Sequence, residues 1–394
     1  MSTSTFELDK ISDARAIAAG ILLYMLAPLG MTLIPLTVGA AATDLGFTNS
    51  EVGYLASVDL AGLAFVSVTA AIWVRRYSWH TIALTSLIVI MVGNGLSIVS
   101  DSFTTLCIAR FITEMGSGGI YALALVTLGE TRTPDRFFSY GIGSTIAVSV
   151  AVFLWYPALI AQYGIDVIFL SHIFLAAAVI PVVFWLPKFV EVQAARTTEG
   201  DDRNLIPLII CFIGFSCIML AEGGLWSYVE RMGSSYGLDA DYVGEVLATT
   251  QVASFIAAML ASTFGARYGR TSPIVLGMAA FLLSLYLLLI PDATMFMIGA
   301  CLSQFAWIFV LPFMMAMCVE LDTSGRYYVL ITAFKMAGFS LGPAIIATFL
   351  GVGGMDQDFA IVSWVSGFFL VLSLILYLPL AIKLDGERQQ EPMV

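Results

Sequence analysis

The chain has 394 residues, of which 59% are hydrophobic and only 11% are charged. A soluble protein of this length would carry roughly 25% charged residues, so the composition excludes a water-soluble globule and places the chain in a lipid bilayer. The net charge of −11 is spread unevenly along the chain, and no basic patch of the kind that binds nucleic acids is present.

Twelve apolar runs divide the sequence, and each is long enough to cross a bilayer as one helix. We expect spanning helices at residues 15–41, 50–74, 80–100, 103–128, 137–162, 167–187, 205–231, 242–266, 273–291, 293–318, 327–350 and 359–383. The residues before the first run are polar and include acids, without the basic segment of a cleaved signal peptide. The first run is therefore expected to stay as a spanning helix of an all-α membrane protein.

The basic residues support twelve spans with both termini in the cytoplasm. In that topology, 14 of the 17 lysines and arginines fall in cytoplasmic segments and none falls in an outside loop. The other three, Arg110, Arg231 and Lys335, lie within or at the ends of expected helices. Because basic residues concentrate on the cytoplasmic side, one helix more or fewer would destroy this agreement. We expect an integral protein of a bacterial inner membrane.

The sequence divides into two similar halves. Its longest polar stretch, KFVEVQAARTTEGDDRN at 188–204, follows the sixth expected helix and is interpreted as a cytoplasmic linker. Short matches at a nearly constant spacing relate the halves, for example VGYLASVD (52–59) with VGEVLATTQ (243–251). This spacing predicts a duplicated six-helix unit, with one bundle at 1–187 and a second at 205–394.

Two local motifs resemble those of the major facilitator superfamily of secondary transporters. GARYGR (265–270) is similar to the family's basic loop between helices, and ARFITEMGSGG (109–119) is similar to its fourth-helix pattern of an arginine followed by small residues. The helix-5 proline-glycine signature of the family's antiporters is absent from GIGSTIAVSVAVF (141–153). The resemblance covers the whole chain and implies two six-helix bundles that rock about a midplane site, which is alternating access.

Charged residues inside spanning helices are costly, so each needs a partner or a function. In the first half, Asp59, Arg110 and Glu114 are expected at a similar depth, and Arg110 and Glu114 lie one turn apart on one helix. Arg110 is either part of a packing ion pair or a substrate contact, and Asp59 and Glu114 are equal candidates for a proton-coupling acid. Small residues that would let neighbouring helices approach closely follow directly, at Gly116, Gly118 and Gly119.

A further buried acid is expected in the seventh span. Glu222 is followed by Gly223 and Gly224, and because glycine weakens a helix we expect a break beside this carboxylate. Such a break suits a gate, and Glu222 is a third candidate for proton coupling, with a water-facing acid as the alternative. Trp226 and Tyr228 are candidates to line the same region, with Trp226 as a candidate substrate contact. The alternative for both is an aromatic residue at the membrane interface, which is favoured for Tyr228.

Lys335 has no acid within one turn of its own helix. Such a lysine needs a substrate anion, an acid from the second span, or partial snorkelling towards the headgroups. In the family that the chain resembles, spans 1, 8 and 10 line the central cavity. That resemblance adds Tyr24, Gln251, Gln304 and Trp307 as candidate substrate-binding residues, with core packing as the alternative for each.

The sequence contains no pattern of an enzyme, a metal site or a cofactor site. Its five cysteines are scattered in apolar runs without metal-binding spacing, and His172 is interpreted as a packing residue. No phosphate-binding loop or nucleophile motif is present, which disfavours an ATP-driven pump. The energy source is expected to be an ion gradient, most simply of protons.

Together these features predict a proton-coupled secondary transporter of a small organic solute. The cations Arg110 and Lys335 favour an organic anion, and the missing antiporter signature favours uptake by symport. The alternative is proton-driven efflux of amphipathic drugs or metabolites, and a non-transporting receptor or an embedded enzyme forms a further class. We expect the partners to be the small-molecule substrate, protons and the lipid bilayer, with the protein acting as a monomer.

Overall fold

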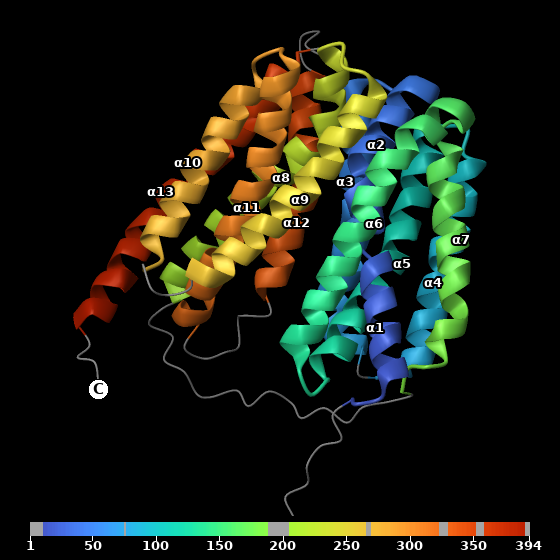
Figure 1. Ribbon diagram of the computed structural model, residues 1–394, viewed down its shortest axis with the longest axis horizontal. Helices are drawn as coiled ribbons and strands as arrows, with labels where there is room; N and C mark the ends of the chain where they lie inside the picture. The colour runs from blue at the N-terminus through green and yellow to red at the C-terminus, as the bar shows by residue number, and fades with distance from the viewer. Residues whose placement is uncertain are drawn as a thin grey trace, which may run out of the picture.

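The computed structural model describes residues 11–74, 76–187, 205–264, 269–322, 330–351 and 358–390, and their regular structure is helical (Figure 1). Two segments singled out in the sequence lie outside these ranges: the expected linker at 188–204, and residues 265–268 of the GARYGR motif.

The first half of the chain contains seven helices and the second half contains six, within the described ranges. The helices of the first half are α1 (Ala14–Leu26), α2 (Leu29–Asp44), α3 (Asn49–Trp73), α4 (Trp79–Ile98), α5 (Phe103–Gly129), α6 (Pro134–Tyr163) and α7 (Asp166–Val183). Those of the second half are α8 (Leu205–Ser235), α9 (Ala240–Phe264), α10 (Thr271–Leu288), α11 (Ala293–Leu321), α12 (Leu330–Leu350) and α13 (Ala360–Gln390).

The predicted twelve spans are confirmed in the described residues, since twelve segments are long and apolar enough to cross a membrane. In several of the described connections between them, side chains cap the helix ends. Before α3, for example, the Glu51 backbone N–H donates to Thr48 Oγ1 at 3.1 Å, and the Thr48 backbone N–H donates to Glu51 Oε2 at 2.9 Å. This reciprocal pair satisfies two amides that a helix start leaves unbonded, which fixes where α3 begins.

The prediction of one continuous first helix is wrong, because the first span is broken between α1 and α2. Pro28 stands at the break, directly before Leu29, where α2 begins. Proline has no backbone N–H, so position 28 cannot donate a helical hydrogen bond, and the proline ring clashes with the carbonyl group four residues earlier. The two pieces together still form one span, from Ala14 to Asp44.

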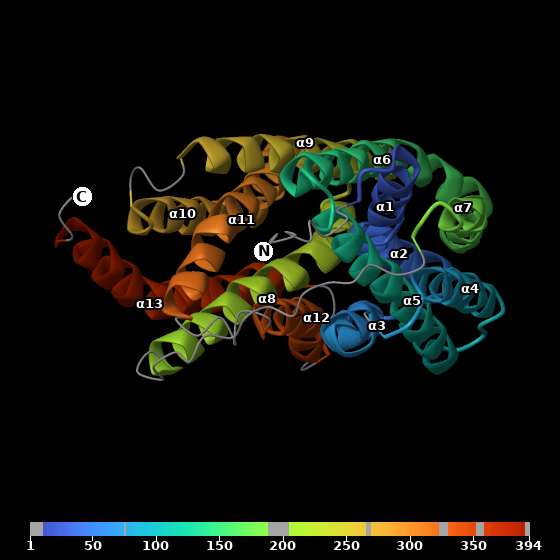
Figure 2. The same cartoon turned by 90° about the horizontal axis from the view of Figure 1, so that it is seen from below.

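Two bundles make up the molecule, and three helix pairs form most of the described contact between them. Helix α3 packs against α12, α6 against α9, and α2 against α8. Figure 2 shows the first two pairs on opposite sides of the interface. In Figure 1 the bundles converge at the top, where α2 ends and α3 begins, and diverge towards the lower end, where α13 ends. We call the converging end the far end. Within the first span, α1 packs against α5, α6 and α7 of its own bundle, whereas α2 packs against α8 of the second bundle.

Hydrogen bonds close the two bundles together at the far end. The Tyr228 hydroxyl donates to the Asn49 carbonyl oxygen at 2.8 Å, and Arg231 Nε donates to Asn49 Oδ1 at 3.0 Å. A second contact joins the Ser50 hydroxyl to the Ala347 carbonyl oxygen at 2.8 Å. We call these residues the far-end contact. They hold α3 of the first bundle to α8 and α12 of the second.

Candidate functional site

A cavity lies between the two bundles, beside the break between α1 and α2. Four lining residues come from the first bundle and four from the second: Pro28, Met31, Leu63, Tyr121, Trp307, Lys335, Met336 and Phe339. Because both bundles contribute to its wall, movement of one bundle against the other would reshape this cavity. It is therefore the candidate binding site.

Lys335 is the charged residue of this lining. It is half-buried on α12, and among the described residues no carboxylate forms an ion pair with it. An acid of the second span is not its partner, because Asp59 on α3 binds Arg110 instead. The ammonium group is therefore available to water or to an anion that enters the cavity.

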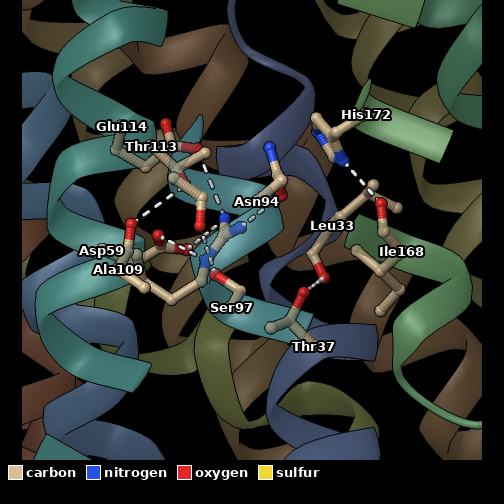
Figure 3. A network of polar contacts seen from close by, with 12 residues as sticks. Leu33, Thr37, Asp59, Asn94, Ser97, Ala109, Thr113, Glu114, Ile168 and His172 are labelled. Carbon is tan, nitrogen blue, oxygen red and sulfur yellow. Dashed lines mark hydrogen bonds and ion pairs between the residues drawn. The ribbon is translucent and has the colours of Figure 1, made fainter. Parts of the chain in front are cut away.

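A buried polar cluster lies in the first bundle, where Figure 3 shows Asp59, Asn94 and Glu114 of α3, α4 and α5 close together. Arg110 of α5 contacts all three of these side chains. Its Nε donates to Asp59 Oδ1 at 3.0 Å and its Nη2 to Asp59 Oδ2 at 3.2 Å, while Nη1 donates to Asn94 Oδ1 at 3.0 Å. The side chain is only 1% exposed, and its guanidinium carbon lies 5.4 Å from the centre of the Phe169 ring. Arg110 is not part of the cavity lining.

The two acids of this cluster differ in how well they are satisfied. Both oxygens of Asp59 accept a hydrogen bond from Arg110. Glu114 receives one longer contact, 3.4 Å from Arg110 Nη2 to its Oε1, and its buried Oε2 has no hydrogen-bond partner among the described residues. The geometry therefore separates two carboxyl groups that the sequence left equivalent.

The expected close approach of helices at the glycines of α5 is confirmed. A Cβ atom at position 116 would lie 2.6 Å from the Ser86 carbonyl oxygen on α4, and one at position 118 would lie 2.8 Å from the Leu63 carbonyl oxygen on α3. Only glycine fits at such distances. Helix α5 is thus held closely against α3 and α4, which brings Asp59 and Asn94 within reach of Arg110.

Glu222 lies in the second bundle and is connected to the cavity by two hydrogen bonds. Gln304 Nε2 donates to Glu222 Oε1 at 2.5 Å, and Trp307 Nε1 donates to Gln304 Oε1 at 2.8 Å. Glu222 is 1% exposed, and its Oε2 has no partner in the described part of the chain. Because Trp307 also lines the cavity, a ligand there would touch the first member of a chain that ends at a buried carboxyl group.

The expected break beside Glu222 is absent, since α8 runs without interruption from Leu205 to Ser235. The two glycines serve close packing instead. A Cβ at position 223 would overlap the Phe339 carbonyl oxygen, and one at position 224 would overlap the side chain of Ile346. Both neighbours belong to α12, so Gly223 and Gly224 bring α8 and α12 together behind the cavity.

The other candidate residues lie at different distances from the cavity. The Tyr24 ring lies 5.8 Å, centre to centre, from that of Tyr121, which lines it. Trp226 Nε1 donates to the Met31 carbonyl oxygen at 3.2 Å and so joins α8 to α2. Gln251 bonds only its neighbour Thr250, at 3.5 Å, among the described residues, and it is not in the lining.

His172 is fully buried on α7, where its Nδ1 lies 2.9 Å from the Ile168 carbonyl oxygen one turn earlier (Figure 3). This placement agrees with its interpretation as a packing residue.

The far-end contact is a feature of the interface between the bundles that sequence reasoning missed. Tyr228 was expected at the membrane interface, but its side chain is fully buried between the bundles. The Ser234 hydroxyl donates to Glu230 Oε1 one turn earlier at 2.6 Å. The Glu230 carboxyl group also packs against Gly39 of α2. The signal in the sequence was the polar density of SYVERMGSS (227–235) at the end of an apolar run, which exceeds what a helix end facing lipid requires.

Comparison with known proteins places the chain among transporters. It matches the Major Facilitator Superfamily over residues 20–209 and 211–392. A stretch of 193 residues is 22% identical to the putative transporter AraJ of Escherichia coli (strain K12) and covers 48% of either chain, so the match spans about half the length of that curated relative.

Several solved structures share the fold. A bacterial homolog of the human lysosomal transporter Spinster, in an inward-facing and unoccupied conformation, has a TM-score of 0.72 at 14% identity, over 97% of this chain and 100% of that one. The nucleoside transporter NupG has a TM-score of 0.72 at 13% identity, over 92% and 97%. The human organic anion transporter MFSD10 has a TM-score of 0.62 at 14% identity, over 93% and 100%. At these identities the likeness establishes the fold and leaves the substrate open. With the family match across nearly all of its length and twelve spans in two bundles, the chain belongs to the Major Facilitator Superfamily.

Proposed function

We propose that this protein is a proton-coupled secondary transporter that takes up a small organic anion by alternating access. The observation that carries the proposal is the connection between the cavity and a buried acid. Lys335 and Trp307 line the cavity, and two hydrogen bonds lead from Trp307 through Gln304 to Glu222. The second bundle thereby places a cation for the substrate, Lys335, and an acid for the proton, Glu222, at the same cavity, one in its wall and the other two hydrogen bonds away.

The substrate side of the proposal depends on Lys335. Its ammonium group has no carboxylate partner among the described residues, and a cation enclosed by apolar walls gains most from an anion that replaces its lost hydration. Trp307, Gln304, Tyr24 and Trp226 surround or support the same region and are proposed to shape it.

The proton side of the proposal depends first on Glu222. Its carboxyl group is enclosed by protein and forms no ion pair within the described ranges, so a bound proton removes the cost of an uncompensated buried charge. Asp59 and Glu114 share the single cation Arg110, and their cluster is electrically balanced when one acid carries a proton. Glu114, with its unpartnered oxygen, suits that role better than Asp59.

Alternating access requires that the far-end contact open during the cycle. The distribution of basic residues favours cytoplasmic termini, so the arrangement described here corresponds to a state that faces the cytoplasm. The cavity is formed by the two halves of one chain, which is why we propose that a monomer transports. A bacterial inner membrane is the proposed location.

A substrate-driven proton flux experiment tests this function. The protein is reconstituted in liposomes that contain a trapped pH-sensitive dye, and benzenesulfonate is added outside without an imposed gradient. This anion stays charged across the accessible pH range, so it cannot cross the lipid as a neutral acid. Symport predicts acidification of the lumen, which Glu222→Gln should abolish.

The surface variant Arg136→Gln is a matched control, because Arg136 is exposed and contacts only Tyr140 among the described residues. Alkalinisation of the lumen on adding a compound would instead indicate exchange, which is the efflux alternative. The absence of any proton flux with a range of organic anions, in vesicles shown to contain folded protein, would refute the proposal.

A further inference from the structure

The cavity offers a ligand one charged group and little other polarity. Five of its eight lining residues are apolar: Pro28, Met31, Leu63, Met336 and Phe339. The N–H of Trp307 is bonded to Gln304 at 2.8 Å, so a ligand can accept it only by displacing that bond. A ligand in this cavity therefore meets the Lys335 ammonium group and a largely apolar wall.

Arg110 does not supply a second positive charge to this site. Its Nε, Nη1 and Nη2 are all engaged by Asp59, Asn94 and Glu114, and its side chain is 1% exposed. To reach a ligand it would have to leave two carboxyl groups buried without their cation, which is strongly unfavourable. The cavity can therefore compensate one negative charge.

The cation and the aromatic wall lie next to each other. Lys335 and Phe339 are one turn apart on α12, so their side chains share a face of that helix. Both line the cavity together with Trp307 of α11. An anionic group on the ammonium would leave the rest of a ligand against Phe339 and Trp307, where a flat apolar body is well accommodated.

We infer that the substrates of this site are hydrophobic monoanions, with one carboxylate or sulfonate on an aromatic or similarly apolar body; the inference rests on the proposed function for the physiological role of the site. A second carboxylate would be buried without a cation. A sugar acid would lose the hydration of several hydroxyl groups, and beside Lys335 and Trp307 the lining offers only the Tyr121 hydroxyl to replace it.

Binding to the purified full-length protein in detergent tests the inference without protons or transport. Thermal unfolding is followed with a matched set of probes: benzoate, benzyl alcohol, benzylamine, terephthalate, cyclohexanecarboxylate and gluconate. Ligand binding raises the melting temperature according to its concentration relative to Kd, so each titration gives an apparent affinity. We expect benzoate and cyclohexanecarboxylate to bind at least about tenfold more tightly than the dianion, the cation, the alcohol and the sugar acid.

Two variants at one position and a surface control make the test specific. Lys335→Gln should reduce the preference for benzoate over benzyl alcohol to within about threefold, because only the charge contact is lost and the apolar wall remains. Lys335→Arg should retain that preference. Arg136→Gln removes an exposed positive charge that is not part of the cavity lining and should behave as the parent protein does.

Terephthalate or gluconate binding as tightly as benzoate would overturn the inference. The same holds for tighter binding of benzylamine, for a benzoate preference that survives Lys335→Gln, and for the absence of any shift with all six probes. If monoanions bind selectively but drive no proton flux in liposomes, the proposed function fails and the inference stands. If anion-driven proton flux occurs but dianions are preferred, the inference fails and the proposed function stands.

Discussion

Replacing Gly53 with alanine should open the far end of the molecule. A Cβ atom at this position would overlap the Tyr228 hydroxyl and would lie 2.8 Å from the Ala347 Cβ. The Tyr228 hydroxyl cannot stay where it is, so its 2.8 Å bond to the Asn49 carbonyl oxygen is lost. Overpacking costs about 1–3 kcal/mol and a lost hydrogen bond about 0.5–1.5 kcal/mol. Since the cost applies only while the bundles touch there, the closed far end should lose roughly 2–4 kcal/mol relative to the open one, a shift of about 30-fold or more in population.

Distances between spin labels measure this shift directly. Leu45 on the first bundle and Asp239 on the second are exposed near the far end, and both are replaced by labelled cysteines after the native cysteines have been removed. Gly53→Ala should move the distance distribution to longer values. The matched control is Gly95→Ala on α4, where an added Cβ meets nothing within 4 Å. An unchanged distribution for Gly53→Ala, with the variant folded, would refute the claim that the far-end contact governs the closed state.

Three further predictions concern the buried groups. Asp59→Asn should lower the free energy of unfolding by about 3–5 kcal/mol, because it breaks a two-point buried ion pair. Glu114→Gln loses only a 3.4 Å contact and should lower it by under about 1.5 kcal/mol. If thermal unfolding in detergent shows the reverse order, the assignment of the two acids is contradicted. Gly30→Ala should destabilise by about 1–3 kcal/mol, since its Cβ would overlap the Glu114 carboxyl group, while Gly129→Ala, with no neighbour within 4 Å, should have little effect in the same assay. Gln304→Leu removes both hydrogen bonds of its amide and should lower the number of protons moved per anion more than it lowers anion binding; a parallel loss of both would point to a purely structural role.

The number of spans and their helical character could be predicted from sequence because hydropathy and length are properties of a segment on its own. The break in the first span could not be located in this way. Pro28 interrupts the helix, yet Pro35 lies inside α2 without ending it. Whether a proline ends a helix or only bends it depends on whether the surrounding spans accommodate the lost backbone hydrogen bond and the kink, and this is set by packing.

The charged residues were identified from sequence, but their partners were not. Burial cost singles out Asp59, Arg110, Glu114, Glu222 and Lys335 without saying which of them meet. The sequence allows an acid of the second span as a partner for Lys335, but in the structure that acid, Asp59, forms an ion pair with Arg110.

Because glycine disfavours an isolated helix, the sequence predicts a break at the glycines beside Glu222, and the structure has none there. These glycines allow α12 to approach α8 closely. The partner of Asp59 and the role of these glycines are both set by contacts between segments far apart in the chain, which local sequence does not encode.

The bond from Trp307 to Gln304 has a consequence for the order of events in transport. An indole nitrogen can only donate, and it has one hydrogen to give. Because Gln304 uses its NH₂ group on Glu222 and its oxygen on that indole, the orientation of the amide is fixed by its two neighbours. An arriving anion that accepts the indole hydrogen competes for it with the amide oxygen. The freed oxygen then becomes an acceptor without a donor, next to the carboxyl group that we propose carries the proton. Binding of the anion at Trp307 would thus be coupled to a rearrangement of Gln304 beside Glu222, because both depend on the single indole hydrogen.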